Sequence, residues 1–65
     1  MQGVIKTIAA DRGFGFITRE GEKDLFFHAK NLKGIRFEEL RVGDTLSFEI
    51  GEGEKGQHAL NIQFV

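Results

Sequence analysis

The sequence predicts an all-β protein, a five-stranded antiparallel barrel, and three observations support this prediction. The chain has 65 residues, of which 40% are hydrophobic, so it can form one domain with a single small core. Apolar residues alternate with polar ones in several short runs, which is the period of a β-strand. Turn residues separate these runs. Five short strands are too few for a stable sandwich, and closing the sheet into a barrel removes its edges.

Each expected strand follows from its own pattern. The strands are expected over residues 2–8, 14–19, 23–28, 44–50 and around 60–64. The first run is rich in β-branched residues and ends at the turn over 11–13. The segment 20–22 carries a hairpin signal, Glu-Gly-Glu. Residues 30–43 break the alternation, so we expect a long loop with one helical turn near 37–40.

The alternation also predicts the core. The expected inward residues are Ile5, Ile17, Leu25, Phe27, Leu46, Phe48, Ile50, Leu60 and Ile62, with Phe64 at the end of the last strand. This set leaves Phe14, Phe16 and Phe26 outside. If those rings were packed in the core instead, Ile17, Leu25 and Phe27 would face water, because a shift of one residue reverses every side chain. The pattern therefore favours exposed rings over ordinary barrel packing.

Exposed rings at alternate positions point to a ligand. The run at 12–17, Arg-Gly-Phe-Gly-Phe-Ile, is followed by Leu-Phe-Phe-His at 25–28. On the predicted strands Phe14 and Phe16 share one face, as do Asp24, Phe26 and His28. Rings beside glycines form a flat platform, and nucleic-acid bases are the planar groups that most often lie on one.

Charge is distributed unevenly along the chain. The net charge is −1, which argues against binding a polyanion by electrostatics alone. Residues 1–36 hold seven basic and four acidic side chains, a balance of +3, and residues 37–65 hold two basic and six acidic ones, a balance of −4. The positive half carries the glycine–aromatic run. We therefore expect local polyanion contacts and a modest dependence on salt.

Composition argues against several other functions. There is no cysteine, and neither His28 nor His58 has partners at metal-ligand spacing, so we expect no disulfide, metal or cofactor. The single serine, Ser47, lies mid-strand, and a domain this small leaves no room for a deep cleft, so we expect no enzyme and no small-molecule substrate. The GxGxxG match at 51–56 lacks a following helix and carries glutamates that would repel a pyrophosphate. With no membrane-spanning run and no signal pattern, we expect a soluble, cytoplasmic protein.

On these motifs the chain resembles a bacterial cold-shock protein, the single-domain form of the cold-shock domain, over residues 1–65. The runs at 12–17 and 25–28 are similar to the first and second ribonucleoprotein motifs of that family. The resemblance implies an oligonucleotide-binding (OB) fold that holds single-stranded RNA or DNA, acts as an RNA chaperone and is monomeric. Carried over by position, the stacking side chains would be Phe14, Phe16, Phe26, His28 and Phe37. Lys6, Arg12 and Lys55 would lie near phosphates, and Asp24 would accept a hydrogen bond from a base edge.

Several of these positions have alternative interpretations. Phe37 could anchor its loop on the core, and His28 could be a surface histidine or a hydrogen-bonding residue at a strand end. The charged residues are individually no more than solvated side chains.

The sequence also departs from the family pattern. Thr7 stands where the family usually has tryptophan, Ile8 and Ala9 replace phenylalanine and asparagine, and Ala29 replaces an aromatic residue in many bacterial members. Each base–aromatic stack contributes about 1–3 kcal/mol, so we expect weaker binding over a shorter footprint. The main alternative is a barrel of the same fold that interacts with a protein or the ribosome and whose nucleic-acid binding is weakened. A hydrolase is a third alternative.

Overall fold

The computed structural model describes residues 1–53 and 56–65. Its elements, in chain order, are β1 (Gln2–Ala9), β2 (Phe14–Thr18), β3 (Leu25–His28), η1 (Ala29–Asn31), η2 (Phe37–Glu39), β4 (Thr45–Gly53) and β5 (Gly56–Phe64). The strands agree with the predicted ones except at their ends: β3 begins two residues later than expected, and β5 already begins at Gly56. The helical turn expected near 37–40 is the 3-10 helix η2.

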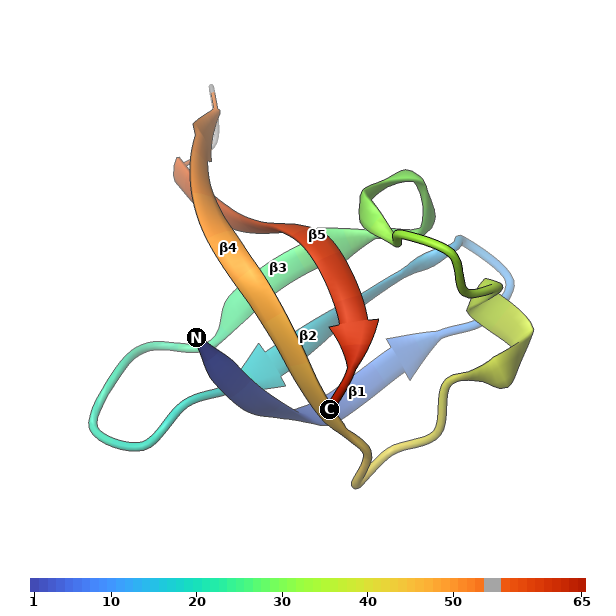
Figure 1. Ribbon diagram of the computed structural model, residues 1–65, viewed down its shortest axis with the longest axis horizontal. Helices are drawn as coiled ribbons and strands as arrows, with labels where there is room; N and C mark the ends of the chain where they lie inside the picture. Colours follow the sequence, from blue (N-terminus) through green and yellow to red (C-terminus); the bar gives the residue numbers. More distant parts are fainter. Residues whose placement is uncertain (54–55) are drawn as a thin grey trace.

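The five strands form a closed barrel in the order β1-β2-β3-β5-β4 (Figure 1). In Figure 1, β4 and β5 cross in front of the sheet formed by β1, β2 and β3. The predicted five-stranded barrel is thus confirmed, and four of its strand pairings are antiparallel as expected. The pairing that closes the barrel, β3 with β5, is parallel and runs through Phe26 and His58.

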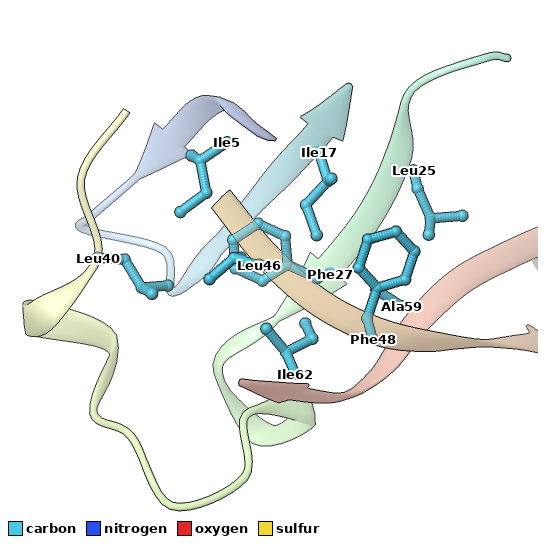
Figure 2. Close-up of a cluster of buried hydrophobic side chains, with 9 residues drawn as sticks. All are labelled: Ile5, Ile17, Leu25, Phe27, Leu40, Leu46, Phe48, Ala59 and Ile62. Carbon is cyan, nitrogen blue, oxygen red and sulfur yellow. The ribbon is translucent and has the colours of Figure 1, made fainter. Parts of the chain in front are cut away.

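Among residues 1–53 and 56–65, nine buried hydrophobic residues fill the barrel (Figure 2). They are Ile5, Ile17, Leu25, Phe27, Leu40, Leu46, Phe48, Ala59 and Ile62. Most of this set follows the alternation in the sequence. Leu40, which the sequence placed in a loop, is buried as well, and Ile50 is half-buried and packs against the core.

The prediction for the last strand was partly wrong. Asn61 has a positive φ of 51°, and β5 shifts register there relative to β4. This irregularity brings Ala59 and Ile62 to the same inner face, whereas Leu60 pairs with Glu49 on the outside. The side chain of Leu60 lies over Gly51.

Phe64 also differs from its predicted inward position. It is 40% exposed at the end of β5. Its register partner is Leu46, in the second position of β4, so the ring sits at the rim of the barrel. A strand end has fewer neighbours than a strand centre, and the ring is left partly in solvent.

Candidate nucleic-acid interface

Three phenylalanine rings from β2 and β3 lie together on the outside of the barrel. We call Phe14, Phe16 and Phe26 the aromatic cluster. Their ring centroids are 5.7 to 6.2 Å apart, within the range of edge-on and tilted aromatic contacts. Phe16 is the cross-strand partner of Phe26, which explains how two separate sequence motifs form one surface. Phe26 is 37% exposed and the other two rings are half-buried, so the expected position outside the core is confirmed.

Gly15 allows the core to pack directly beneath the cluster. A Cβ at this position would lie 2.5 Å from the carbonyl oxygen of Thr7 and 2.9 Å from the ring of Phe27. No side chain fits in that space, since Phe27 is fully buried under the strand. Glycine between the two phenylalanines of β2 is therefore required by packing, and it keeps the strand close to β1.

Two of the departures from the family pattern, Thr7 and Ala29, lie beside the cluster. Thr7 is exposed and is the cross-strand partner of Phe16. Ala29 follows β3, where its N–H donates to the carbonyl of Gly13 at 2.8 Å. Both are small residues, so neither adds a ring to the cluster.

The charged residues that the sequence predicts to contact nucleic acid lie in different surroundings. The Lys6 Nζ lies 2.9 Å from the Asp24 Oδ2, and both side chains are at least one-third exposed. The two residues therefore form an ion pair at the margin of the cluster. Arg12 is exposed in the turn between β1 and β2, where its backbone N–H donates to the carbonyl of Ala9 at 3.0 Å. Lys55 lies outside the described residues.

His28 ends β3 opposite Phe14 and caps the following 3-10 helix η1. Its backbone N–H donates to the Asn31 Oδ1 at 3.0 Å, and its Nδ1 accepts from the Lys30 N–H at 3.2 Å. The structure thus gives His28 the strand-end hydrogen bonds that the sequence left as an alternative. The half-buried imidazole is also continuous with the cluster through Phe14.

A groove with a volume of about 570 Å³ extends the cluster towards β5. It is lined by two glycines of the β4–β5 hairpin together with Phe26, His28, Lys30, Asn31, Gln57 and His58. Sequence reasoning did not place Lys30, Asn31, Gln57 or His58 in the site, and it missed His58 because β5 was expected to begin after it. The alternation could have identified it: if the strand is extended towards the N-terminus from an inward Ala59, His58 points outward.

Phe37 is not part of the aromatic cluster. Its ring centroid is 6.3 Å from that of Phe27, and the side chain is half-buried against the core. This contact matches the alternative interpretation, in which Phe37 anchors its loop on the barrel.

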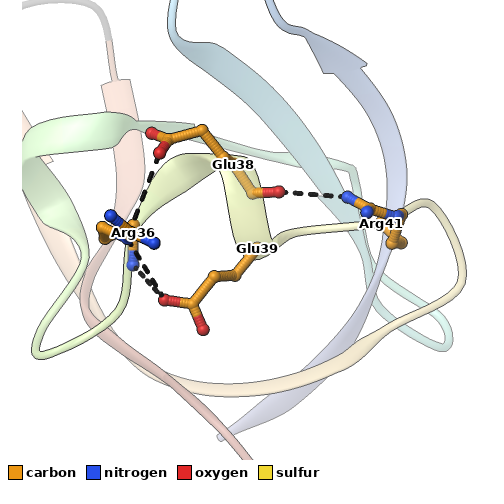
Figure 3. A network of polar contacts seen from close by, with 4 residues as sticks. All are labelled: Arg36, Glu38, Glu39 and Arg41. Carbon is orange, nitrogen blue, oxygen red and sulfur yellow. Dashed lines mark hydrogen bonds and ion pairs between the residues drawn. The ribbon is translucent and has the colours of Figure 1, made fainter.

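Polar contacts hold η2 in place (Figure 3). The backbone N–H of Arg36 donates to the Glu39 Oε1 at 3.1 Å, and the Arg41 Nη1 donates to the Glu38 carbonyl at 3.0 Å. The guanidinium of Arg36 also lies within 4.0 Å of both carboxylates. These exposed pairs each contribute little energy. Together with Phe37 and Leu40 they fix the course of the loop.

Residues 1–53 and 56–65 contain no group of three or more His, Cys, Asp or Glu placed to hold a metal ion. Within the same ranges, no helix has the length and hydropathy needed to cross a membrane.

The fold and the site define a class of protein: a small closed β-barrel with an aromatic face on two adjacent strands. The family described as "'Cold-shock' DNA-binding domain" matches residues 1–65. The chain belongs to the cold-shock domain family, which is a nucleic-acid-binding family. The predicted resemblance is thereby confirmed.

Individual relatives agree with this assignment. The chain is 39% identical over 61 residues to cold shock protein CspA of Staphylococcus saprophyticus, covering 94% of this chain and 92% of the relative. It is equally similar to cold shock protein CspA of Staphylococcus aureus strain USA300. Among solved structures, the chain matches "drosophila Unr CSD456" with a TM-score of 0.78 and 29% identity. That match covers 98% of this chain and 26% of the other, so the chain spans about a quarter of that structure.

Proposed function

We propose that this chain acts as one cold-shock-like domain that binds single-stranded RNA or DNA by stacking bases on the aromatic cluster. The observation that carries the proposal is the placement of three phenylalanine rings outside the core, on adjacent strands. Phe26 is 37% exposed and adjoins two half-buried rings, and contiguous apolar patches on the surface of a protein often mark sites of interaction. Every base has a π-face, so stacking accepts a strand with little regard to its sequence.

Phosphate contacts make a smaller contribution in this proposal. Arg12 in the exposed turn and Lys6 at the margin of the cluster would contact the backbone, as would Lys55. Lys6 is paired with Asp24 in the free protein, so a phosphate would compete for it with the carboxylate. Asp24 would then be available to accept a hydrogen bond from a base edge.

The proposed cellular role follows from mass action. A protein that binds unpaired strands but not duplexes shifts the equilibrium of a folded RNA towards its open form. This is the action of an RNA chaperone, and it requires neither turnover nor a cofactor. We propose that the chain performs it as a monomer, in the cytoplasm, without catalytic activity.

The central prediction concerns the double variant Phe14→Ala, Phe26→Ala. Each base–aromatic stack contributes about 1–3 kcal/mol, so removing two rings should weaken binding of a fluorescein-labelled dT7 strand about thirtyfold or more. Fluorescence anisotropy at fixed salt measures the affinity. The barrel should stay folded, which circular dichroism can check, because neither ring belongs to the buried core.

A matched control is Phe64→Ala. Phe64 is 40% exposed, close to the 37% of Phe26, but it lies at the rim of the barrel, away from the cluster. Binding should survive this change. If the double variant bound dT7 as tightly as the wild type, stacking on the cluster would be the wrong mechanism.

The same measurements separate this proposal from a barrel that binds a protein or the ribosome. Such a module is favoured by one observation, the small residues Thr7 and Ala29 beside the cluster. It predicts only weak binding of single strands by the wild type. A hydrolase, in contrast, predicts cleavage of the oligonucleotide, which a denaturing gel after incubation would reveal.

A further inference from the structure

A β-bulge in β1 places two consecutive side chains on the outside of the barrel, next to the aromatic cluster. The register of β1 with β2 shifts between Ile5 and Thr7, so Lys6 is the extra residue. Ile5 is buried, whereas Lys6 and Thr7 are both exposed. Thr7 is the cross-strand partner of Phe16, and the two members of such a pair project to the same face of the sheet. The Thr7 side chain therefore lies beside the Phe16 ring.

The Lys6–Asp24 ion pair makes this margin of the cluster polar. The strand β2 lies between β1 and β3 in the barrel (Figure 1). Lys6 belongs to β1 and Asp24 directly precedes β3, so their contact at 2.9 Å passes over the outer face of β2. Thr18, at the end of β2, is exposed on the same face as Phe16. Beyond Phe16 the surface thus carries hydroxyl, ammonium and carboxylate groups in place of rings.

The neighbours of Phe16 decide where the sugar of a nucleotide stacked on that ring can lie. On the β3 side the neighbour is Phe26, whose ring centroid is 5.8 Å away and which would stack a base of its own. On the β1 side the neighbour is Thr7, one strand spacing of about 4.8 Å away. That spacing is close to the distance between the centre of a pyrimidine and the ribose attached to it. We therefore expect the sugar to lie over Thr7.

The hydroxyl of Thr7 suits a sugar in this position. None of the side-chain hydrogen bonds found in residues 1–53 and 56–65 uses this hydroxyl. A threonine hydroxyl can both donate and accept a hydrogen bond. The 2′-OH of ribose can do the same, and it is the group by which a protein distinguishes RNA from DNA. A deoxyribose at this place would leave the Thr7 hydroxyl to water.

We propose that Thr7 selects RNA over single-stranded DNA through a hydrogen bond to the 2′-OH of the nucleotide stacked on Phe16. The proposal rests on the proposed function, because it needs a base on the aromatic cluster. It adds a distinction that the rings cannot make, since stacking reads only the face of the base and that face is the same in both nucleic acids. Thr7 is then the specificity-determining residue of the surface.

The test compares the uridine heptamer U7 with its 2′-fluoro analogue, which keeps the sugar pucker of RNA but has no hydroxyl. For the wild type we expect U7 to bind about fivefold more tightly, the effect of one hydrogen bond. The informative variant is Thr7→Val, which has the shape of threonine without the hydroxyl and is well suited to a strand. Fluorescence anisotropy at fixed salt gives the two affinities.

The ratio of the U7 affinity to that of the analogue is the readout. In Thr7→Val this ratio should fall about fivefold from its wild-type value. Thr45→Val is the matched control, because it makes the same change at an exposed position of β4 that is not next to the cluster. The control should keep the wild-type ratio.

The outcomes separate this proposal from the proposed function. If the wild type binds both heptamers equally, or if Thr7→Val leaves the ratio unchanged, selection by Thr7 is wrong while stacking on the cluster stands. An equal fall in Thr45→Val would also overturn it, because the effect would not depend on the position beside Phe16. If neither heptamer binds the wild type, the proposed function itself fails.

Discussion

Individual residues set the extent of the aromatic surface. Gly15 keeps β2 close to the core, so Phe14 and Phe16 are presented on the other face. Thr7 occupies the position next to Phe16 on β1 without supplying a ring. The extent of the aromatic surface is therefore limited by small side chains at neighbouring positions and not by the path of the backbone.

At this scale we predict that Thr7→Phe strengthens binding. The new ring would stand beside Phe16 on an exposed position and could stack one more base. The gain should be about fivefold or more in affinity for dT7, corresponding to about 1–3 kcal/mol. Anisotropy titrations of wild type and variant at the same salt measure it.

Thr45→Phe is the control for that gain. Thr45 is also exposed on a strand, but it lies in β4, where it pairs with Val4 of β1, and it is not a neighbour of the cluster. An equal gain from both variants would mean that added apolar area, and not its position, raises the affinity. Low-nanomolar binding by the wild type would show that the small residue at position 7 costs nothing.

The segment between β3 and β4 breaks the alternation of apolar and polar residues, yet it has a clear structural role. It contributes Leu40 to the buried core and Phe37 to the layer packed against it. Its hydrogen-bonded 3-10 helix η2 holds both side chains against the barrel. The segment therefore covers one part of the core.

We accordingly predict that Leu40→Ala lowers the free energy of unfolding by about 2–5 kcal/mol, through lost burial and the cavity that remains. Thermal or urea unfolding followed by circular dichroism measures the change. Val42→Ala, two residues further along and 64% exposed, should be nearly neutral. If the two variants were equally stable, packing of this segment on the core would contribute nothing to the free energy of unfolding.

The whole molecule is nearly neutral, with a net charge of −1. Its proposed ligand is a polyanion, so long-range attraction is small and binding must depend mainly on short-range contacts. Stacking is insensitive to salt, whereas each phosphate contact releases counterions. The balance between the two can be measured.

For this reason we predict a shallow salt dependence. With Lys6, Arg12 and Lys55 each contacting a phosphate, the slope of log K against log salt concentration should be about −2 for a single strand. Titrations of dT7 across a range of salt concentrations give the slope directly. A value several-fold steeper would mean that phosphate contacts, and not the rings, dominate the affinity.

Much of the fold follows from local patterns. Alternation in β2 and β3 separates Ile17, Leu25 and Phe27 from the rings of the cluster, because neighbouring side chains in a strand point to opposite faces. The same reasoning fails at Leu60. There Asn61 adopts a left-handed conformation, and such an irregularity depends on the register in which β5 pairs with β4.

The sequence by itself determined the class of fold, most of the core and the outward face of the aromatic motifs, since all of these depend on periodicity within a strand. Only the tertiary structure decided which distant segments meet. It set His58 beside Phe26 through a parallel pairing, and it turned Phe37 towards Phe27 and away from the cluster. Such contacts join residues far apart in the chain, so no local pattern specifies them.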